Sequence, residues 1–370
     1  MLKPETIRAA AADSAVSRLP HPARLAATQA HLPEMLQKML GSEWSVVFRE
    51  LSDTSATLPE ALRRMTAGRK LPVFTSLFLA SAAMPGGTEQ GGPVGAMAYL
   101  RQHIKPAPHF RLDDALVGML EQTDIAEDIP LSMFTLPFQR FYIEMGETRS
   151  CSCTIPNELS GDHILEGAYI ERGLHADGEF LYVVLTGSPL GKADANDDAT
   201  VGVALPLGNP EKPLSLAIMD AIQSSRNSAK PMGYRLSPES WSGDILKAML
   251  LLAKALLYIG LSDTRRELHA ERTQAEKAIQ GLKSPAKQGK ARRRAAKVYD
   301  YIRIAPQEVH RQVARAMATG ASPGAHWRRG HLRMQAHGPQ MSLRKLILLQ
   351  PMLVGATAGE TAPHRTYKVS

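Results

Sequence analysis

The pattern of apolar and polar positions changes twice along the chain. Up to residue 125 it is rich in alanine and has mostly helical spacing, interrupted by prolines. From Ile129 onward, short segments rich in aromatic and β-branched residues alternate with Gly, Asp and Asn, which is typical of antiparallel strands. The predicted strands cover residues 134–144, 150–155, 167–172 and 180–186. Pro137 cannot donate to a strand ladder, so the first of them is expected to be an edge strand or to be broken there.

Helical spacing returns after the predicted strands. We expect helices over 213–224 and 245–259, and a charged helix from Asp263 or Thr264 to about residue 282. A short helix over 113–122 begins with two aspartates, which favour the positive end of the helix dipole. The most apolar helix, 245–259, is shorter than the roughly 20 residues that cross a bilayer. It is therefore predicted to be buried, with no membrane contact.

These elements predict an α+β protein with a helical N-terminal region, a central, mainly antiparallel sheet with packed helices, and a small C-terminal β module. The predicted boundaries follow the changes in composition: a helical region over 1–125, a core domain over 126–282, a basic linker over 283–297 and the β module over 298–370.

The positive charge is concentrated near the end of the chain. The net charge is +8, but the residues from Leu261 onward carry +14 and the preceding ones −6. A concentrated positive field favours nucleic acid, a ribosomal surface or an acidic protein as partner. A solvated basic tail that only aids solubility is the alternative.

Residues 283–297 contain seven Lys or Arg residues, no acidic residue and no large apolar residue. Such a segment has little to bury, so we predict a mobile linker or a basic arm that contacts RNA. A helix over 290–297, induced by RNA, is also compatible with the sequence. The candidate contact residues are Lys290, Arg292, Arg293, Arg294 and Lys297.

Cys151 and Cys153 are the only cysteines. A C-x-C pair makes a poor disulfide and an incomplete metal site, so both are interpreted as structural residues of a protein in the reducing cytoplasm. The N-terminus lacks the charged and apolar segments of an export signal. We predict no metal and no cofactor.

Residues 326–339 contain the densest group of side chains suited to binding a partner. At a strand's period of two, Arg329, His331, Arg333, Gln335 and His337 share one face, while the other face begins with Gly330 and Leu332. Arginine forks bind phosphate or carboxylate, and tryptophan stacks on planar groups. The predicted binding residues are His326, Trp327, Arg328, Arg329, His331, Arg333 and Gln335. The structural alternative is that these side chains hydrogen-bond within their own domain.

The same residue types also suit metal-free RNA cleavage, with His331 and His337 as acid and base and Arg333 stabilising the transition state. The intervals between the histidines do not match common metal-ligand spacings. The chain has no Walker A, dinucleotide-binding, zinc-protease or nucleophile-elbow motif, and an isolated acid such as Glu144 is expected to be exposed. We therefore favour a binding protein over an enzyme, and if it is an enzyme we expect a ribonuclease.

Residues 326–355 resemble the C-terminal module of a family of phage and plasmid proteins that includes type V-A anti-CRISPR proteins. A weaker similarity lies in residues 132–137 and 142–144. The main shared positions are Arg328, Arg329, Gly330, His331, Gln335, Gly338, Pro351, Val354 and Gly355. Leu332 and Met334 depart from the family, which has bulkier residues there.

The resemblance implies a cytoplasmic protein that lowers the amount of a type V-A CRISPR effector nuclease. Its expected partner is the nascent N-terminal polypeptide of that nuclease, together with the ribosome or the mRNA, whose loss it would promote. A metal-free ribonuclease and a nucleic-acid-binding accessory protein of a mobile element remain the alternatives.

Overall fold

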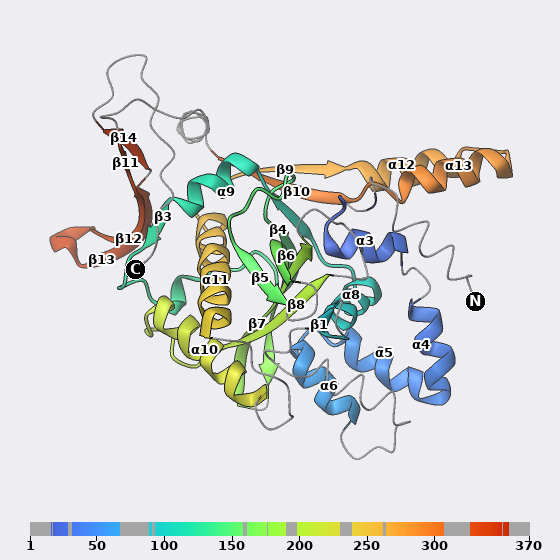
Figure 1. Ribbon diagram of the computed structural model, residues 1–370, viewed down its shortest axis with the longest axis horizontal. Coiled ribbons are helices and arrows are strands. Elements are labelled where there is room, and N and C mark those ends of the chain that lie inside the picture. Colours follow the sequence, from blue (N-terminus) through green and yellow to red (C-terminus); the bar gives the residue numbers. More distant parts are fainter. Residues whose placement is uncertain are drawn as a thin grey trace.

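A mixed β-sheet forms the centre of the molecule, with helices on both sides (Figure 1). The computed structural model describes residues 16, 18–28, 32–66, 89–90, 93–157, 161–175, 177–189, 198–229, 239–261, 264–306, 326–349 and 351–354. A helical N-terminal region, the sheet with its packed helices and a small C-terminal set of strands are all present. The predicted α+β class is confirmed.

The central sheet contains nine strands within the described residues, in the order β1-β8-β7-β6-β4-β2-β10-β9, with β5 also paired to β6. Its neighbours are antiparallel except at β2, which is parallel to both β4 and β10. Its strands are β1 (Glu89–Gln90), β2 (His109–Leu112), β4 (Arg140–Glu144), β5 (Thr154–Asn157), β6 (Gly161–His175), β7 (Gly178–Pro189), β8 (Ala199–Pro206), β9 (Arg265–Ala270) and β10 (Asp300–Ala305).

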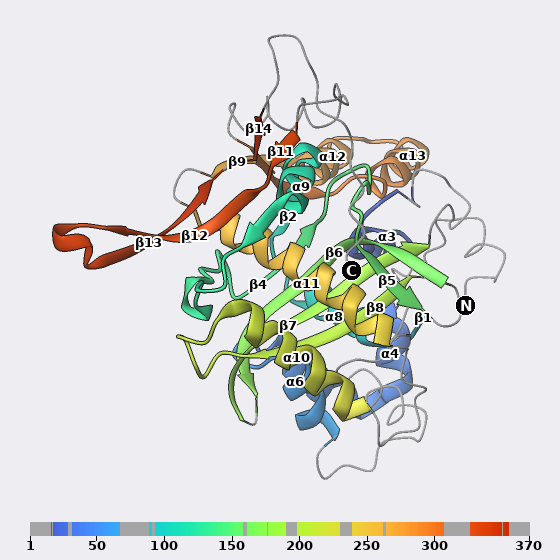
Figure 2. The same ribbon diagram turned by 60° about the vertical axis from the view of Figure 1, so that its left-hand side comes forward.

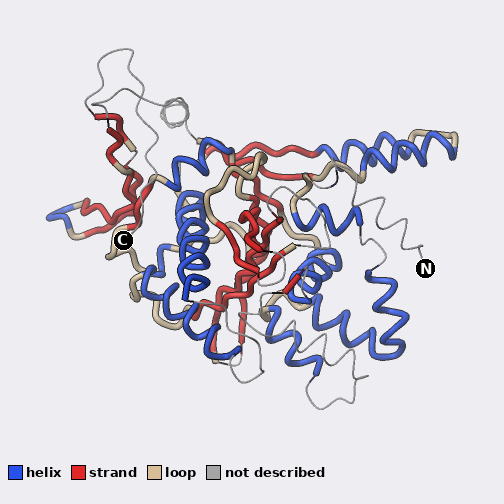
Figure 3. Tube along the Cα trace, in the orientation of Figure 1, coloured by secondary structure: helices blue, strands red, loops and turns tan. Residues whose placement is uncertain are grey.

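The two sides of the sheet have separate hydrophobic cores because successive strand residues point to opposite faces. In β7, Val183 belongs to one core, whereas its neighbours Tyr182 and Val184 belong to the other. Figure 3 shows the helices on either side of these strands. With both faces covered, β7 buries a continuous apolar run over residues 181–185, whereas β6 also buries the charged residues Glu166 and Glu171.

One core lies beneath α9 (Asp114–Glu121), α10 (Leu214–Ala229) and α11 (Glu239–Ile259). The N-terminal helices cover the other side (Figure 1). They are α3 (His21–Thr28), α4 (Leu32–Leu40), α5 (Trp44–Ser52), α6 (Leu58–Thr66) and α8 (Pro93–Ile104), with a 3-10 turn at Gly41–Glu43.

Helices α9, α10 and α11 confirm three of the predicted helices. Asp113 caps α9, since its Oδ1 accepts a hydrogen bond from the Ala115 amide at 3.0 Å. Helix α11 buries Ile245 and Leu252 as its apolar spacing predicts. In the described part of the chain, no helix is both long and apolar enough to cross a membrane.

The strand predicted over 134–144 begins only at Arg140, after a 3-10 turn at Leu131–Met133 and a loop that contains Pro137. The strand is therefore broken at the proline. Its remaining part, β4, lies between β6 and β2 in the sheet and is not an edge strand. The predicted strands 167–172 and 180–186 lie within β6 and β7. The prediction over 150–155 is wrong for its first four residues, which form a loop, because β5 begins only at Thr154, where pairing with β6 starts.

The charged helix predicted from about residue 264 is wrong over its first turns. Residues 265–270 form β9, which pairs with β10 along its full length, and only then does α12 (Glu271–Gln280) begin. The Oδ1 atom of Asp300 accepts hydrogen bonds from the amides of Arg272 and Thr273 at 2.8 and 3.1 Å. A side chain distant in sequence thus fixes where the helix starts.

The segment predicted to be a mobile basic linker contains the helix α13 (Pro285–Ala295). It packs beside α12, and Ala295 is buried while its carbonyl accepts a hydrogen bond from Arg272 at 2.6 Å. Pro285 stands at the start of the helix, where its missing N–H costs nothing.

Strands β2 and β10, which belong to two different predicted regions, are neighbours in the central sheet. The predicted domain boundaries stay a prediction.

Candidate functional site

The His- and Arg-rich stretch forms an antiparallel hairpin of β12 (Gly330–His337) and β13 (Leu343–Leu349). A 3-10 turn at Pro339–Met341 joins the strands, and Gly338 before it has φ of 77°, a conformation that favours glycine. Strand β12 also pairs in parallel with β3 (Thr123–Ile125), which follows α9. The hairpin is thus attached at one end and extends away from the body, at the left of Figure 2.

The inner face of the hairpin holds it on the body. Leu332 is fully buried and belongs to the core beneath α11, and the side chains of Met334, Leu346 and Leu348 pack against the same core. This is the apolar face that the alternation predicts for β12. The hairpin is therefore positioned by the ordinary hydrophobic effect.

The outer face of the hairpin mixes basic, polar and apolar side chains. Cross-strand neighbours in an antiparallel pair project to the same side, so β12 and β13 build this face together. Leu343 is 53% and Leu349 39% exposed. The outer face consists of His331, Arg333, Gln335 and His337 of β12, opposite Leu349, Ile347, Lys345 and Leu343 of β13.

Three predicted binding residues already have partners on the surface. Arg333 Nη2 donates to Gln335 Oε1 at 2.9 Å, and Arg329 Nη1 lies 2.7 Å from Asp124 Oδ1 in an exposed ion pair. The Asp124 contact ties the start of the hairpin to β3. Arg329 therefore has a structural role, whereas Arg333 and Gln335 present a joined polar group to solvent.

The predicted catalytic residues do not converge. His331 and His337 share the outer face, but they lie six residues apart on one strand, which separates them by about 20 Å. A general acid and a general base for one phosphodiester must both reach the reacting group within hydrogen-bond distance. The hairpin geometry therefore disfavours the ribonuclease built from these histidines and Arg333.

His326, Trp327 and Arg328 belong to β11 (His326–Arg328), which pairs with β14 (Met352–Val354). The positions of these three side chains lie outside the described part of the structure. Their proposed contacts to a partner stay a prediction. In the chain, β11 comes directly before the hairpin, and Figure 1 shows it next to β14.

The basic residues of the predicted arm lie on or directly after α13. All five are exposed, and the pair α12–α13 extends from the edge of the sheet at the upper right of Figure 1. The helix α13 is formed in the protein without RNA. These residues are Lys290, Arg292, Arg293, Arg294 and Lys297.

Lys297 also lines a cavity of about 740 Å³ beside α12, which the sequence pattern does not reveal. Its wall includes Arg18, Arg149 and the buried group described next. Residues from five separate parts of the chain form the wall, so no local spacing could have identified it. The lining residues are Arg18, Leu19, Arg111, Glu144, Glu147, Thr148, Arg149, Glu271, Lys297, Val298, Tyr299 and Tyr301.

Glu144 is the centre of this wall and is buried, contrary to the exposed position expected from the sequence. Its Oε2 accepts hydrogen bonds from Arg111 Nε at 3.0 Å and Tyr299 Oη at 2.6 Å, and lies 3.2 Å from His109 Nε2. The Arg111 guanidinium lies 3.9 Å from the centre of the Tyr301 ring. Glu144 is thus already held by its neighbours and offers no free base.

Electrostatics keep this group in one protonation state near neutral pH. Burial would raise the pKa of Glu144, but its hydrogen bond with His109, the charge of Arg111 and the hydrogen bond from Tyr299 hold it below its usual value. Burial also lowers the pKa of His109, against the effect of Glu144. The result is an ionised carboxylate beside a neutral imidazole, which makes a rigid polar wall.

A second buried group links α3 to the sheet. Arg24 Nη2 lies 2.7 Å from both Glu166 Oε1 and Asp198 Oδ2, and all three side chains are about 1% exposed. Burial opposes ionisation of Glu166, but Arg24 and Arg149 lower its pKa to about 2. Burial raises the pKa of Asp198 to about 7, although Arg24 opposes this shift. This group is structural and lies away from the hairpin.

Comparison with known proteins places the chain among the anti-CRISPR proteins. It belongs to the AcrVA2-like family, the anti-CRISPR type V subtype A2 family, whose model matches residues 110–356 and therefore well over half of the chain. The matched range includes most of the central sheet, but not β1, together with α13 and the hairpin. The resemblance stated from residues 326–355 is confirmed.

Among solved structures, the crystal structure of AcrVA2 is similar to this chain with a TM-score of 0.42 and 12% identity. The alignment covers 89% of this chain and 99% of that one. No curated protein matches the chain.

Proposed function

We propose that the protein suppresses a type V-A CRISPR effector nuclease by binding the effector's nascent N-terminal polypeptide and promoting loss of its mRNA. Membership of the anti-CRISPR family supports the target class. The single observation that carries the peptide-binding step is the projecting hairpin β12–β13, with its mixed basic and apolar outer face.

The hairpin suits an extended peptide because β13 pairs on one side only within the described residues, in the order β13-β12-β3. The backbone groups on its other side point outward in the manner of an edge strand. An unfolded chain emerging from a ribosome has its own backbone groups free, so it is able to add as a further strand. Main-chain hydrogen bonds would supply affinity, and the outer face would select side chains.

The outer face favours a segment that alternates acidic and apolar residues. Lys345 and Arg333 present positive charge in the middle of this face, while Leu343 and Leu349 present apolar surface at its two ends. Arginine recognises carboxylates through paired hydrogen bonds, and exposed leucines gain free energy when a partner covers them. The proposed partner is therefore an extended peptide with such an alternation.

The basic helix α13 supports contact with the message or with ribosomal RNA. Arg292, Arg293 and Arg294 are exposed and lie at the end of the helix nearest the cavity that Lys297 lines. Such contacts to phosphates release counterions, so they weaken steeply as the salt concentration rises. Peptide recognition by the hairpin and RNA contact by α13 would occur on different parts of the molecule.

The peptide step is tested by capturing the protein from cells that translate the effector, with or without its first few dozen codons. We expect effector mRNA to be recovered only with the complete message. Equal recovery in both cells would refute recognition of the nascent N-terminus.

Matched variants of β13 locate the binding surface. Lys345→Glu reverses a charge on the outer face, whereas Arg344→Glu reverses an equally exposed charge that points to the other side of the same strand. We expect mRNA recovery to fall about tenfold for Lys345→Glu, the effect of about 1.4 kcal/mol of lost binding energy. Arg344→Glu should keep most of it. Equal losses would exclude the outer face.

The RNA step is tested by replacing Arg292, Arg293 and Arg294 with alanine. We expect weaker ribosome or RNA association at low salt and a shallower dependence on salt concentration. Replacement of the exposed Arg49 on α5 serves as the control for a general loss of charge. Unchanged association in the triple variant would remove α13 from the mechanism.

The two alternatives give different results with purified components. Cleavage of effector mRNA without ribosomes that disappears in His331→Ala would establish the ribonuclease and overturn the proposal. A nucleic-acid-binding accessory protein would instead bind duplex DNA in a salt-sensitive way, independently of any translated CRISPR gene.

A further inference from the structure

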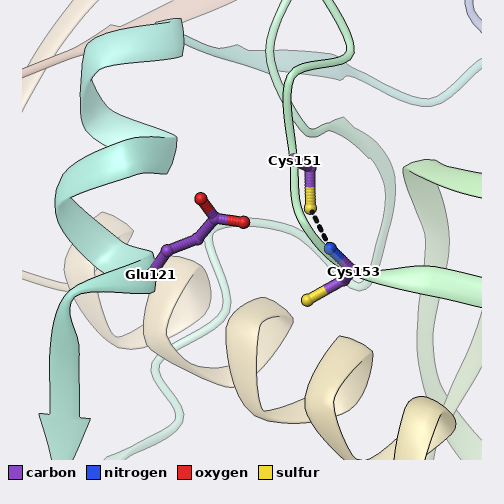
Figure 4. A group of neighbouring side chains, drawn as sticks. All are labelled: Glu121, Cys151 and Cys153. Carbon is purple, nitrogen blue, oxygen red and sulfur yellow. Dashed lines mark hydrogen bonds between the residues drawn. The ribbon is translucent and has the colours of Figure 1, made fainter. Parts of the chain in front are cut away.

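The loop before β5 and the end of α9 bring two thiols and a carboxylate together. Cys151 and Cys153 are buried free cysteines, and Glu121 is the last residue of α9. One ligand atom from each, the two Sγ atoms and a carboxylate oxygen, lie within 4.8 Å of one another. Figure 4 shows the Glu121 side chain directed from the helix toward the cysteines.

We propose that Glu121, Cys151 and Cys153 bind a zinc ion, with one coordination position left for water or a fourth ligand. Zinc accepts thiolates at about 2.3 Å and carboxylate oxygens at about 2.0–2.2 Å in a tetrahedral arrangement. Ligand atoms around such an ion lie somewhat closer to one another than 4.8 Å, the distance within which these three atoms all lie here. Only a small inward movement of the three side chains is therefore required.

Hydrogen bonds from neighbouring groups orient the side chains of two proposed ligands, Glu121 and Cys151. Glu121 Oε1 accepts hydrogen bonds from the Ser152 amide at 2.6 Å and the Ser152 hydroxyl at 2.7 Å. The other carboxylate oxygen is then left for the ion. Cys151 Sγ accepts a hydrogen bond from the Cys153 amide at 3.3 Å, drawn as the dashed line in Figure 4. Such partners fix the direction of metal ligands.

The local charges also fit a divalent ion. Two thiolates and one carboxylate carry three negative charges, which zinc reduces to one. The charge of Lys254 on α11 interacts with both Cys153 and Glu121, and its Nζ is held by the Thr123 carbonyl at 2.9 Å. The loaded site would be neutral overall, which suits its position against the core.

The ligand types select zinc over other common ions. Calcium and magnesium prefer all-oxygen sites, and the two sulfurs argue against both. Copper(I) favours sulfur ligands alone, whereas zinc accepts sulfur and oxygen together. Because Glu121 ends α9 and Thr123 begins β3, a bound ion would also brace the strand to which the hairpin is attached.

The direct test uses cobalt(II) as a spectroscopic probe of the reduced, metal-free, full-length protein. We expect one cobalt per chain, sulfur-to-cobalt charge-transfer absorption, and displacement of the cobalt by zinc. A spectrum without charge-transfer absorption, or binding that zinc does not displace, would overturn the proposal.

Three substitutions distinguish a site from adventitious binding. Cys153→Ser should abolish the charge-transfer absorption of that ligand and weaken zinc binding at least about tenfold, and Ser152→Ala should weaken it by about 10–100-fold through loss of an orienting hydrogen bond. Ser150→Ala, in the same loop but outside the group, should bind as the unchanged protein does. Equal zinc affinity in Cys153→Ser and Ser150→Ala would refute the assignment.

A stability measurement keeps the test independent of any folding defect in the cysteine variant. Glu121→Gln keeps the shape of the side chain and an acceptor for Ser152, but supplies a poorer metal ligand. Zinc should raise the melting temperature of the unchanged protein, because it binds only the folded state, and raise that of Glu121→Gln less. An equal rise in both would exclude Glu121 as a ligand.

Discussion

In both the central sheet and the hairpin β12–β13, successive side chains point to opposite faces, but the two regions differ in how many of these faces are covered. Both faces of the central sheet are covered by helices, so β7 places Val183 and Tyr182 in two separate cores. The hairpin covers only its inner face, with Leu332 at its base. Its outer face is therefore available to a partner, whereas the sheet is committed to the fold.

The charges of the two regions differ in the same way. In the body, Arg24 joins two buried carboxylates, and a charge removed there leaves others without compensation. At the hairpin, Arg329 and Asp124 form a pair that is nearly half exposed on both sides. The body uses charge for its structure, and the hairpin displays charge at little cost in stability.

The largest expected effect comes from breaking the buried group of the body. Arg24→Met should destabilise the protein by about 3–5 kcal/mol, since Glu166 and Asp198 lose their shared cation. Urea unfolding followed by circular dichroism measures this change. Arg49→Met, at an exposed pair with Glu50, is the control and should cost less than about 1 kcal/mol. Similar losses in both variants would contradict the proposed contrast.

The next effect separates the two faces of the hairpin. Leu332→Ala should cost about 3 kcal/mol because it leaves a cavity in the core. Leu343→Ala, on the outer face, should change the free energy of unfolding by only about 0.5 kcal/mol. Paired denaturant titrations provide the comparison. If Leu343→Ala were the more destabilising, the outer face would be part of the fold and unavailable for binding.

A third prediction concerns acid. The folded pKa of Glu166, about 2, lies below its ordinary value of 4.5, so its contribution is present above about pH 4.5 and is lost as the pH falls toward 2. Asp198, with a folded pKa of about 7, is already protonated there. The loss should be about 2–3 kcal/mol. Glu166→Gln should flatten the pH dependence over this window, and an unchanged slope would contradict this role.

The smallest expected effect is at the base of the hairpin. Arg329→Ala removes an exposed ion pair with Asp124 and should cost less than about 1 kcal/mol. High salt should reduce the difference from the unchanged protein further, because exposed pairs are screened. Unfolding at low and high salt tests this. A cost comparable to that of Arg24→Met would mean that the hairpin depends on charge for its attachment.

Local signals were sufficient for several elements. The apolar stripe of α11 and the capping Asp113 of α9 are features of neighbouring residues, and both helices formed where they were expected. The alternation over 330–337 likewise predicted β12 and the burial of Leu332. A strand that covers one core face carries its orientation in its own sequence.

Other elements depended on contacts between distant residues. The start of α12 is fixed by Asp300, and β9 forms by pairing with β10, although its sequence favours a charged helix. The basic stretch of α13 has no apolar stripe, yet it is helical because it lies against α12. Tertiary pairing overrides weak local preference in these cases.

The sequence by itself determined the α+β class, the most apolar helices, the alternating face of β12 and the family that residues 326–355 resemble. Only the tertiary structure decided that His331 and His337 stay apart, that Glu144 is buried, and that Glu121 meets Cys151 and Cys153. The physical reason is that periodicity records which side of an element is apolar. Which distant elements meet there depends on how the whole chain packs.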